Sequence, residues 1–320
     1  MIEIVTQSEA MREVAHLAER VASTDANVLI TGESGSGKDA LALFIHSRSL
    51  RSSHDLVKID CASLPTELLE AELFGYEAGA FTGATEAKPG RLEAADKGTL
   101  LLDEIAHLST DAQAKLLRVI EEREFERLGG RRSIKVDTRL IAMTNVDLDE
   151  AVKRHSFRED LFYRLNVVRL RLPPLRQRRE DIAELAQRFL KIYASKHGRV
   201  LKGLTPQALS VLKEHDFPGN VRELANTIER AVIVSSNSRI DEADLPDSLR
   251  ASVALQDLGR RQTLAEVESA YVAEMLEVAK GNKSEAARIL GISRKNLYER
   301  LERQGERRKG KGESDDMPAA

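Results

Sequence analysis

One glycine-rich stretch constrains this chain more than any other part of its sequence. An apolar run lies at 28–30 before it, and a stretch typical of a helix follows at 40–45. A strand, a glycine loop and a helix in this order predict phosphate binding, because the glycines let backbone N–H groups converge on phosphate oxygens. The helix adds its positive N-terminal end, and Lys38 supplies a charge for the β- and γ-phosphates. The predicted cofactor-binding residues are Gly32, Glu33, Ser34, Gly35, Ser36, Gly37, Lys38 and Asp39.

A second motif, Gly98-Thr99-Leu100-Leu101-Leu102-Asp103-Glu104, reads as a buried strand that ends in two carboxylates. Asp103 can hold Mg²⁺ through water, because Mg²⁺ prefers few carboxylates and several waters. Glu104 can orient and deprotonate the attacking water. Either motif alone has a simpler alternative, a glycine-rich turn with no ligand or an ordinary strand end. Together they indicate an ATPase with ATP and Mg²⁺ as cofactors.

The chain of 320 residues has room for about two or three domains. Cys61 is the only cysteine, which excludes an intrachain disulfide and suits a reducing compartment. The sequence has no long uncharged apolar run, and its N-terminus lacks the basic and apolar regions of a signal peptide. We therefore expect a cytoplasmic protein without a membrane partner. Residues 1–27 read as a lead-in helix, so no N-terminal sensory domain is expected.

Strands alternate with helices up to about residue 172, which predicts a mostly parallel α/β sheet with its ligand at the carboxyl ends of the strands. The lead-in helix has apolar residues at Met11, Val14, Leu17 and Val21, and strands are expected at 56–60 and 134–144. The strand pattern stops at 172–175, and from Asp181 to Leu249 the chain reads as helices only. The expected organisation is an α/β domain at 1–172, a helical domain at 173–250, a linker at 251–262, a DNA-binding domain at 263–305 and a disordered tail at 306–320.

The segment 281–301 predicts a helix-turn-helix. Gly291 would make the turn, Ser293 would cap the second helix, and Ile292, Leu297 and Leu301 would face inward. An apolar stripe on a preceding helix comprises Leu264, Val267, Tyr271, Met275 and Ala279. The outward residues suit double-stranded DNA, although a charged helical hairpin is the alternative. They are Arg294, Lys295, Asn296, Tyr298 and Arg300.

The hexapeptide Gly79-Ala80-Phe81-Thr82-Gly83-Ala84, preceded by Glu72-Leu73-Phe74-Gly75, resembles the signature loop of bacterial enhancer-binding proteins. These are AAA+ ATPases that activate sigma-54-dependent transcription, and the similarity covers roughly residues 5–305. The resemblance implies an AAA+ P-loop domain with a parallel sheet, an α-helical lid and a C-terminal Fis-like helix-turn-helix. It also implies that the six loop residues contact sigma-54, with a second surface loop at 127–131 beside them.

The same resemblance assigns roles to other residues. Arg158 and Arg164 would reach the nucleotide of a neighbouring subunit, although they could instead be surface arginines paired with Glu159 and Asp160. Asn145 would act as a first sensor on the attacking water or the γ-phosphate. Arg222, in the segment Phe217-Pro218-Gly219-Asn220-Val221-Arg222-Glu223-Leu224, would act as a second sensor on the phosphates. On DNA, Arg294 and Asn296 would contact bases, whereas Asn282, Ser284 and Tyr298 suit phosphates.

Asp60 stands where the family carries Asn, the residue that engages the catalytic Glu104 as a switch. Two nearby carboxylates disfavour joint ionisation, so two outcomes are open. The pair could share a proton, or Asp60 could turn away to a cation. We expect the strand that ends at Asp60 to run beside the one that ends at Asp103-Glu104, which would bring the side chain of Asp60 toward Glu104.

The resemblance implies a transcriptional activator that binds upstream DNA sites and remodels the closed sigma-54 RNA polymerase complex to an open one. ATP hydrolysis in a hexameric ring would drive this change. A separate protein or the abundance of the activator would control it. Two alternatives are a DNA-binding regulator that binds ATP without remodelling polymerase and a replication-initiator-type ATPase. The intact hexapeptide argues against both.

Overall fold

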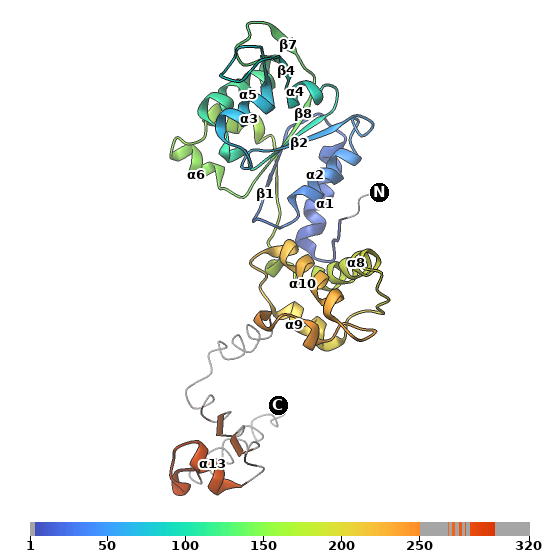
Figure 1. Ribbon diagram of the computed structural model, residues 1–320, viewed down its shortest axis with the longest axis vertical. Coiled ribbons are helices and arrows are strands. Elements are labelled where there is room, and N and C mark those ends of the chain that lie inside the picture. Colours follow the sequence, from blue (N-terminus) through green and yellow to red (C-terminus); the bar gives the residue numbers. More distant parts are fainter. Residues whose placement is uncertain are drawn as a thin grey trace, which may run out of the picture. The chain divides into compact units, whose positions relative to one another are not determined.

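The computed structural model describes residues 4–249, 268, 271–272, 275–276, 279 and 282–297. It divides into two compact units, Met1–Leu249 and Arg250–Ala320 (Figure 1). The first unit contains both the α/β part and the helices predicted as a lid. The predicted domain boundaries within and after it stay predictions.

The α/β part is built on one sheet of five parallel strands in the order β2-β5-β8-β1-β9. This arrangement confirms the predicted parallel sheet. The carboxyl ends of β1, β5 and β8 meet at one edge, which brings the glycine loop, the acidic pair and Asn145 together. The strands are β1 (Val28–Thr31), β2 (Leu56–Asp60), β5 (Thr99–Asp103), β8 (Arg139–Thr144) and β9 (Val168–Arg171).

Both faces of this sheet are buried under helices, because side chains alternate along each strand. In β5, Leu100 and Leu102 pack on one face while Leu101 packs on the other. Helices α1 (Glu9–Ala22) and α2 (Lys38–Ser47) cover the face of Leu101. The opposite face is covered by α3 (Thr66–Phe74), α4 (Arg91–Ala94), α5 (Thr110–Glu122), α6 (Leu148–Lys153) and α7 (Glu159–Leu165).

The prediction of one strand at 134–144 was wrong. Strand β7 (Ser133–Lys135) pairs antiparallel with β6 (Glu124–Glu126) in a separate two-stranded sheet, and β8 begins only at Arg139. Arg139 is almost fully buried and donates to the carbonyl groups of Val21 and Ala22 at 2.8 and 3.0 Å. Its guanidinium thus satisfies carbonyl groups at the end of α1. A second two-stranded sheet pairs β3 (Gly75–Tyr76) with β4 (Lys88–Pro89).

The lead-in helix is shorter than predicted and faces the core differently. It spans Glu9–Ala22, and Leu17 is exposed whereas Met11, Ala18 and Val21 are buried. Its N-cap residue Ser8 is tied to Asp181, which accepts hydrogen bonds from the backbone N–H and the hydroxyl of Ser8 at 2.8 and 2.9 Å. Asp181 is fully buried, so this contact fixes the start of α1 against the helical part.

The helical part comprises α8 (Glu180–Lys196), α9 (Pro206–Glu214) and α10 (Asn220–Val234), gathered at one end of the first unit (Figure 1). Pro206 stands at the first position of α9, where its missing N–H costs nothing, and Thr205 caps that helix. Short 3₁₀ turns complete the unit at η1 (Ile105–His107), η2 (Leu175–Gln177) and η3 (Glu242–Asp244).

In the second unit, α13 (Lys283–Ile289) is followed by a turn and by helical residues at 294–297. Gly291 has a φ of +67° in this turn, as the sequence predicts. Ala286, Ala287 and Leu297 form a small core with Val272. Val272 is buried and Tyr271 is 53% exposed, so the predicted stripe was wrong by one residue there. Predictions on Leu264, Val267, Tyr298, Arg300, Leu301, the linker and the tail lie outside the described residues.

Candidate nucleotide-binding site

The glycine loop holds Lys38 close to its own backbone. The ammonium of Lys38 donates to the carbonyl groups of Gly32 and Glu33 at 2.8 and 3.3 Å, and the side chain is only 7% exposed. Helix α2 begins at Lys38, so its first N–H groups have no intrahelical partner. The hydroxyl of Ser36 is buried and has no hydrogen-bond partner among the described residues. Unpaired donors around a buried cation suit an anion such as a phosphate.

Glu104 follows β5 and lies across the loop from Lys38. Its backbone has φ 52° and ψ 51°, a left-handed conformation that costs a non-glycine residue about 1–3 kcal/mol. Its Oε1 atom lies 3.6 Å from the Nζ atom of Lys38, and its Oε2 atom accepts a hydrogen bond from the backbone N–H of Asn145 at 3.0 Å. The ends of β5, β8 and the start of α2 therefore bring three predicted site residues together.

The acidic residues Asp39 and Asp103 converge on one cation that the sequence reasoning missed. The ammonium of Lys58 forms an ion pair with Asp39 and donates to the Oδ2 atom of Asp103 at 2.8 Å. Burial lowers the pKa of Lys58, but the hydrogen bonds from Lys58 to Asp103 and Asp39 outweigh it and raise the pKa above its ordinary value. The sequence did contain a signal that Lys58 belongs to the site. Lys58 lies two residues before the predicted site residue Asp60 on β2, so the two side chains share one face of the strand.

Asp39 and Asp103 already bind one positive charge, the ammonium of Lys58, and the same pair of carboxylates suits a divalent cation. Mg²⁺ keeps several waters and needs one or two carboxylates together with phosphate oxygens. Asp103 and Asp39 could supply these carboxylates. No cluster of three or more acidic, His or Cys ligands occurs among the described residues, so phosphate and water would have to complete the coordination.

The helical part docks directly on the glycine loop. The carbonyl of Gly35 accepts hydrogen bonds from the backbone N–H groups of Val221 and Arg222 at 2.9 and 3.3 Å. The guanidinium of Arg222 also donates to the hydroxyl of Ser34 at 2.9 Å. A Cβ atom on Gly35, which has a φ of +73°, would lie 2.4 Å from the carbonyl oxygen of Gly219. Position 35 therefore requires glycine. Arg222 lies beside the loop, and its contact with bound phosphates stays a prediction.

Glu33 forms a second contact between the loop and the helical part. Arg176 donates to both of its carboxylate oxygens at 2.8 and 2.5 Å, and the amide of Asn220 donates to Oε2 at 3.1 Å. The hydrogen bonds from Arg176 and then from Asn220 lower the pKa of Glu33 to about 2. Sequence reasoning missed Arg176 and Asn220 as partners, because neither spacing nor residue type predicts where a lid closes.

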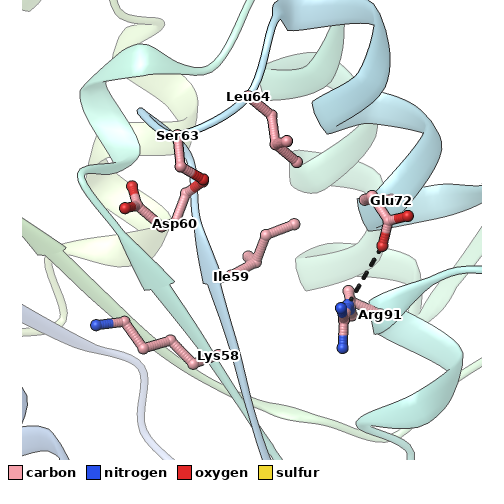
Figure 2. A pocket seen from close by; sticks show the side chains of 7 residues that line it. All are labelled: Lys58, Ile59, Asp60, Ser63, Leu64, Glu72 and Arg91. Carbon is pink, nitrogen blue, oxygen red and sulfur yellow. Dashed lines mark hydrogen bonds and ion pairs between the residues drawn. The ribbon is translucent and has the colours of Figure 1, made fainter.

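We expected Asp60 to lie against Glu104, but its carboxylate has another partner. Strand β2 does run beside β5, with Asp60 paired in register to Asp103. The carboxylate of Asp60, however, accepts a hydrogen bond from the N–H of Ala62 at 2.9 Å and closes a local turn. Among the described residues, the carboxylate of Asp60 therefore neither shares a proton with Glu104 nor pairs with a cation. Figure 2 shows it beside Ser63 in a pocket of about 340 Å³ at the end of β2.

The neighbouring Cys61 is buried and unpaired. Burial, together with the negative charges of Asp60, Asp103 and Glu104, raises the pKa of this thiol to about 12. A thiol in this state is not a nucleophile at neutral pH. Cys61 thus has a packing role.

Arg158 and Arg164 lie at the two ends of α7, where Arg164 is exposed and Arg158 is partly exposed. Arg158 forms an ion pair with Asp160 at 2.7 Å, and Arg164 forms one with Glu121 at 2.8 Å. The pair with Asp160 agrees with the simpler alternative raised by the sequence. The structure of one chain does not bring either arginine to Lys38, and their role toward a neighbouring subunit stays a prediction.

The hexapeptide loop presents Phe81 at the surface. Phe81 is 42% exposed and packs edge-on against Tyr76, with ring centroids 5.0 Å apart. Gly79, Thr82 and Gly83 are also exposed, whereas Ala84 is buried and cannot contact a partner in this conformation. The loop at 127–131 lies alongside as predicted, because a Cβ atom on Gly129 would lie 2.8 Å from the Cβ atom of Ala80.

In the second unit, Arg294, Lys295 and Asn296 are exposed, which agrees with the outward placement predicted for them. Their contacts with DNA stay a prediction. Ser293 caps these helical residues by accepting from the N–H of Asn296 at 3.2 Å. Asn282 caps α13, and its side-chain oxygen accepts from the N–H of Ser284 at 3.0 Å. A capping role therefore occupies that oxygen. None of the described helices combines the length and apolar character that crossing a bilayer requires.

Comparison with known proteins identifies the family of this chain. Residues 4–171 match the sigma-54 interaction domain, residues 176–260 match the AAA+ ATPase lid domain, and residues 263–303 match the Fis family of bacterial regulatory proteins. The regulatory protein AtoC of Escherichia coli is 47% identical over 94% of this chain and 68% of its own length. The transcriptional regulatory protein ZraR of Salmonella typhimurium is 48% identical with the same coverage.

Solved structures agree with this result. NtrX from Brucella abortus in complex with ATP has a TM-score of 0.74 and 34% identity, covering 95% of this chain and 70% of NtrX. Its complex with ADP has a TM-score of 0.70 at the same identity, covering 95% of this chain and 69% of NtrX. These matches confirm the AAA+ fold with a helical lid and a Fis-type helix-turn-helix. This chain therefore belongs to the family of sigma-54-dependent transcriptional activators, the bacterial enhancer-binding proteins.

Proposed function

We propose that this chain binds and hydrolyses ATP and uses the energy to remodel sigma-54 RNA polymerase from upstream DNA sites. The observation that carries the proposal is the convergence of Lys38, Glu104 and Asn145 at the carboxyl edge of the sheet. A phosphate-binding lysine beside a carboxylate that can act as a base is the arrangement that ATP hydrolysis requires. The ATP complex of NtrX supports the choice of nucleotide.

Each residue of the site has a part in this chemistry. Lys38 and the start of α2 would bind the β- and γ-phosphates. Asp103 and Asp39 would hold Mg²⁺, which neutralises phosphate charge when bound. Glu104 would orient the attacking water and accept its proton. Its hydrogen bond from Asn145 fixes the direction of the carboxylate before the water arrives.

The lid and a neighbouring subunit would complete the site. Arg222 already lies on Ser34 and would reach a bound phosphate from there. Arg164 is exposed and Arg158 is partly exposed, so both could reach the nucleotide of a neighbouring chain in a hexameric ring. Since an arginine supplied in trans stabilises transition-state charge, hydrolysis would depend on assembly.

Two surfaces would connect hydrolysis to transcription. The exposed Phe81 and Thr82 would contact sigma-54, because the loop holds an aromatic ring at the surface. Arg294 and Asn296 would read base edges in the upstream DNA site, with Ser284 at a phosphate. The second unit would thus bring the ATPase to the polymerase.

Steady-state ATPase activity measured together with sigma-54 pull-down tests the proposal. We expect ATP turnover, and we expect capture of sigma-54 that depends on the nucleotide present. ATP and DNA binding without capture of sigma-54 would instead indicate a regulator that does not remodel polymerase. ATP turnover without capture of sigma-54, even at high protein concentration, would indicate an ATPase of another class.

A further inference from the structure

Lys58 lies where a metal ion would be expected. It lies on β2, the edge strand of the sheet. Its ammonium contacts carboxylates from two separate elements, Asp39 in the first turn of α2 and Asp103 at the end of β5. These are the two carboxylates that fit Mg²⁺.

The local charges explain why a cation belongs at this point. Asp103 is only 16% exposed, and Glu104 follows it directly. Lys38 is directed elsewhere, to the carbonyl groups of the glycine loop and to Glu104. Among the described residues, Lys58 is thus the cation that contacts both Asp39 and Asp103. Without it, two carboxylates and an incoming polyphosphate would repel one another.

We propose that Lys58 is an internal counter-ion that occupies the metal position before nucleotide binding and is displaced by the metal–nucleotide complex. The inference rests on the proposed function, since that function supplies the metal and the nucleotide. An ammonium and a divalent ion compete for the same carboxylate oxygens, so both cannot occupy this position. Lys58 thereby sets the concentration of metal at which the site becomes loaded.

The surroundings of Lys58 allow the exchange. The side chain is 42% exposed, and Lys58 is one of the residues that line the 340 Å³ pocket beside β2 (Figure 2). A lysine has a flexible four-carbon stem and a strongly hydrated head, so its ammonium can return to water without disturbing packed side chains. A buried arginine fork could not leave so readily.

Lys58→Gln tests the inference through binding rather than turnover. The readout is the affinity for a fluorescent ADP analogue in EDTA and in Mg²⁺, together with Mn²⁺ binding to the nucleotide-free protein by electron paramagnetic resonance. In Lys58→Gln we expect metal-free ADP binding to weaken and Mn²⁺ to bind more tightly. The ratio of ADP affinities with and without metal should therefore rise by about tenfold or more.

Two further variants separate displacement from a purely structural ion pair. Lys58→Arg keeps the charge but supplies a fork that leaves the carboxylates less readily, so metal-free ADP binding should stay near the wild-type value and Mn²⁺ should bind more weakly. Lys88→Gln removes a similarly exposed lysine that pairs with Glu72 on the same part of the protein, and it should leave the ratio unchanged. Circular dichroism and the unfolding temperature check that each variant is folded.

Equal weakening of ADP binding with and without metal in Lys58→Gln would overturn the inference, as would an unchanged or weaker affinity for Mn²⁺. If the wild type binds no ADP under either condition, the proposed function fails. The Mn²⁺ measurement then decides the role of Lys58 by itself. The two failures are therefore distinguishable.

Discussion

The Oε1 atom of Glu104 lies 3.6 Å from the Nζ atom of Lys38, so the candidate base and the loop lysine form an ion pair. A bound phosphate would compete for the same ammonium, since Lys38 is placed to contact the β- and γ-phosphates. Nucleotide binding would then weaken the pair and leave Glu104 held by the N–H of Asn145 alone. The base would become available only when there is a substrate to hydrolyse.

The first prediction concerns Glu104→Gln. The amide keeps the size and the hydrogen bond from Asn145 but cannot accept a proton, so ATP turnover should fall by about 10²–10⁴-fold. Nucleotide affinity should stay near the wild-type value. Steady-state turnover and equilibrium binding of fluorescent ADP check both statements. Glu150→Gln, which alters an exposed carboxylate on α6, is the control. Near-normal turnover in Glu104→Gln would exclude Glu104 as the base.

The second prediction concerns assembly. Arg158→Ala and Arg164→Ala should each lower turnover by about a thousandfold or more if the arginines act in trans. Unfolding temperatures should barely change, because exposed ion pairs contribute little to stability. In the wild type, turnover per subunit should rise steeply with protein concentration. Lys153→Ala, which removes an exposed lysine paired with Glu150, should have no effect. Turnover that is independent of concentration in a monomer would contradict this.

The third prediction uses the contact between Glu33 and Arg176. The pKa of Glu33 is lowered from 4.5 to about 2, so the unfolded chain binds more protons than the folded one between these values. The stabilisation is therefore fully present above about pH 4.5 and is lost as the pH falls toward about 2. The difference in unfolding free energy between the wild type and Glu33→Gln should stay constant from neutral pH down to the start of that window and shrink below it.

Urea unfolding at a series of pH values measures this difference. Arg176→Gln should reproduce the effect, and the double variant should be little worse than either single one, because the two residues act on each other. A difference that grows on acidification would show that the pair does not stabilise the ionised Glu33.

The fourth prediction concerns DNA. Arg294→Ala should cost about 1–3 kcal/mol of affinity for the specific upstream site if Arg294 contacts a base edge. Affinity for unrelated sequences should change less. Arg288→Ala removes an exposed arginine of α13 that pairs with Glu285, and it serves as the control. Equal losses on all sequences would make Arg294 a phosphate contact.

The sequence predicted the parallel sheet and the approach of the glycine loop to the acidic pair because these depend on local pattern. Strand β5 carries three buried leucines and ends at Asp103, with Glu104 directly after it, and parallel pairing then places its end beside the glycine loop. The hairpin of β6 and β7 was missed because apolar or β-branched residues alternate with charged ones over 134–139 and lead directly into β8, so the pattern does not reveal where one strand ends and another begins. Turn geometry decided that point.

Contacts between elements far apart in the chain could not be predicted in the same way. Glu33 and Arg176 are separated by 143 residues, and their pairing depends on how the lid closes. Asp60 was expected at Glu104, but the nearby N–H of Ala62 offered a partner two residues away. A short-range hydrogen bond of this kind needs no rearrangement, and it prevailed over a long-range contact.

The most direct test of the central claim is DNA strand separation at a sigma-54 promoter, measured by permanganate footprinting with polymerase and ATP. The wild type should open the promoter with ATP but not with a non-hydrolysable analogue. Phe81→Ala and Thr82→Ala should keep near-normal ATP turnover and fail to open it, because the loop lies outside the nucleotide site. Thr85→Ala, an exposed neighbour, should behave as the wild type. Opening without hydrolysis, or loss of turnover in proportion to the loss of opening in Phe81→Ala, would contradict the account.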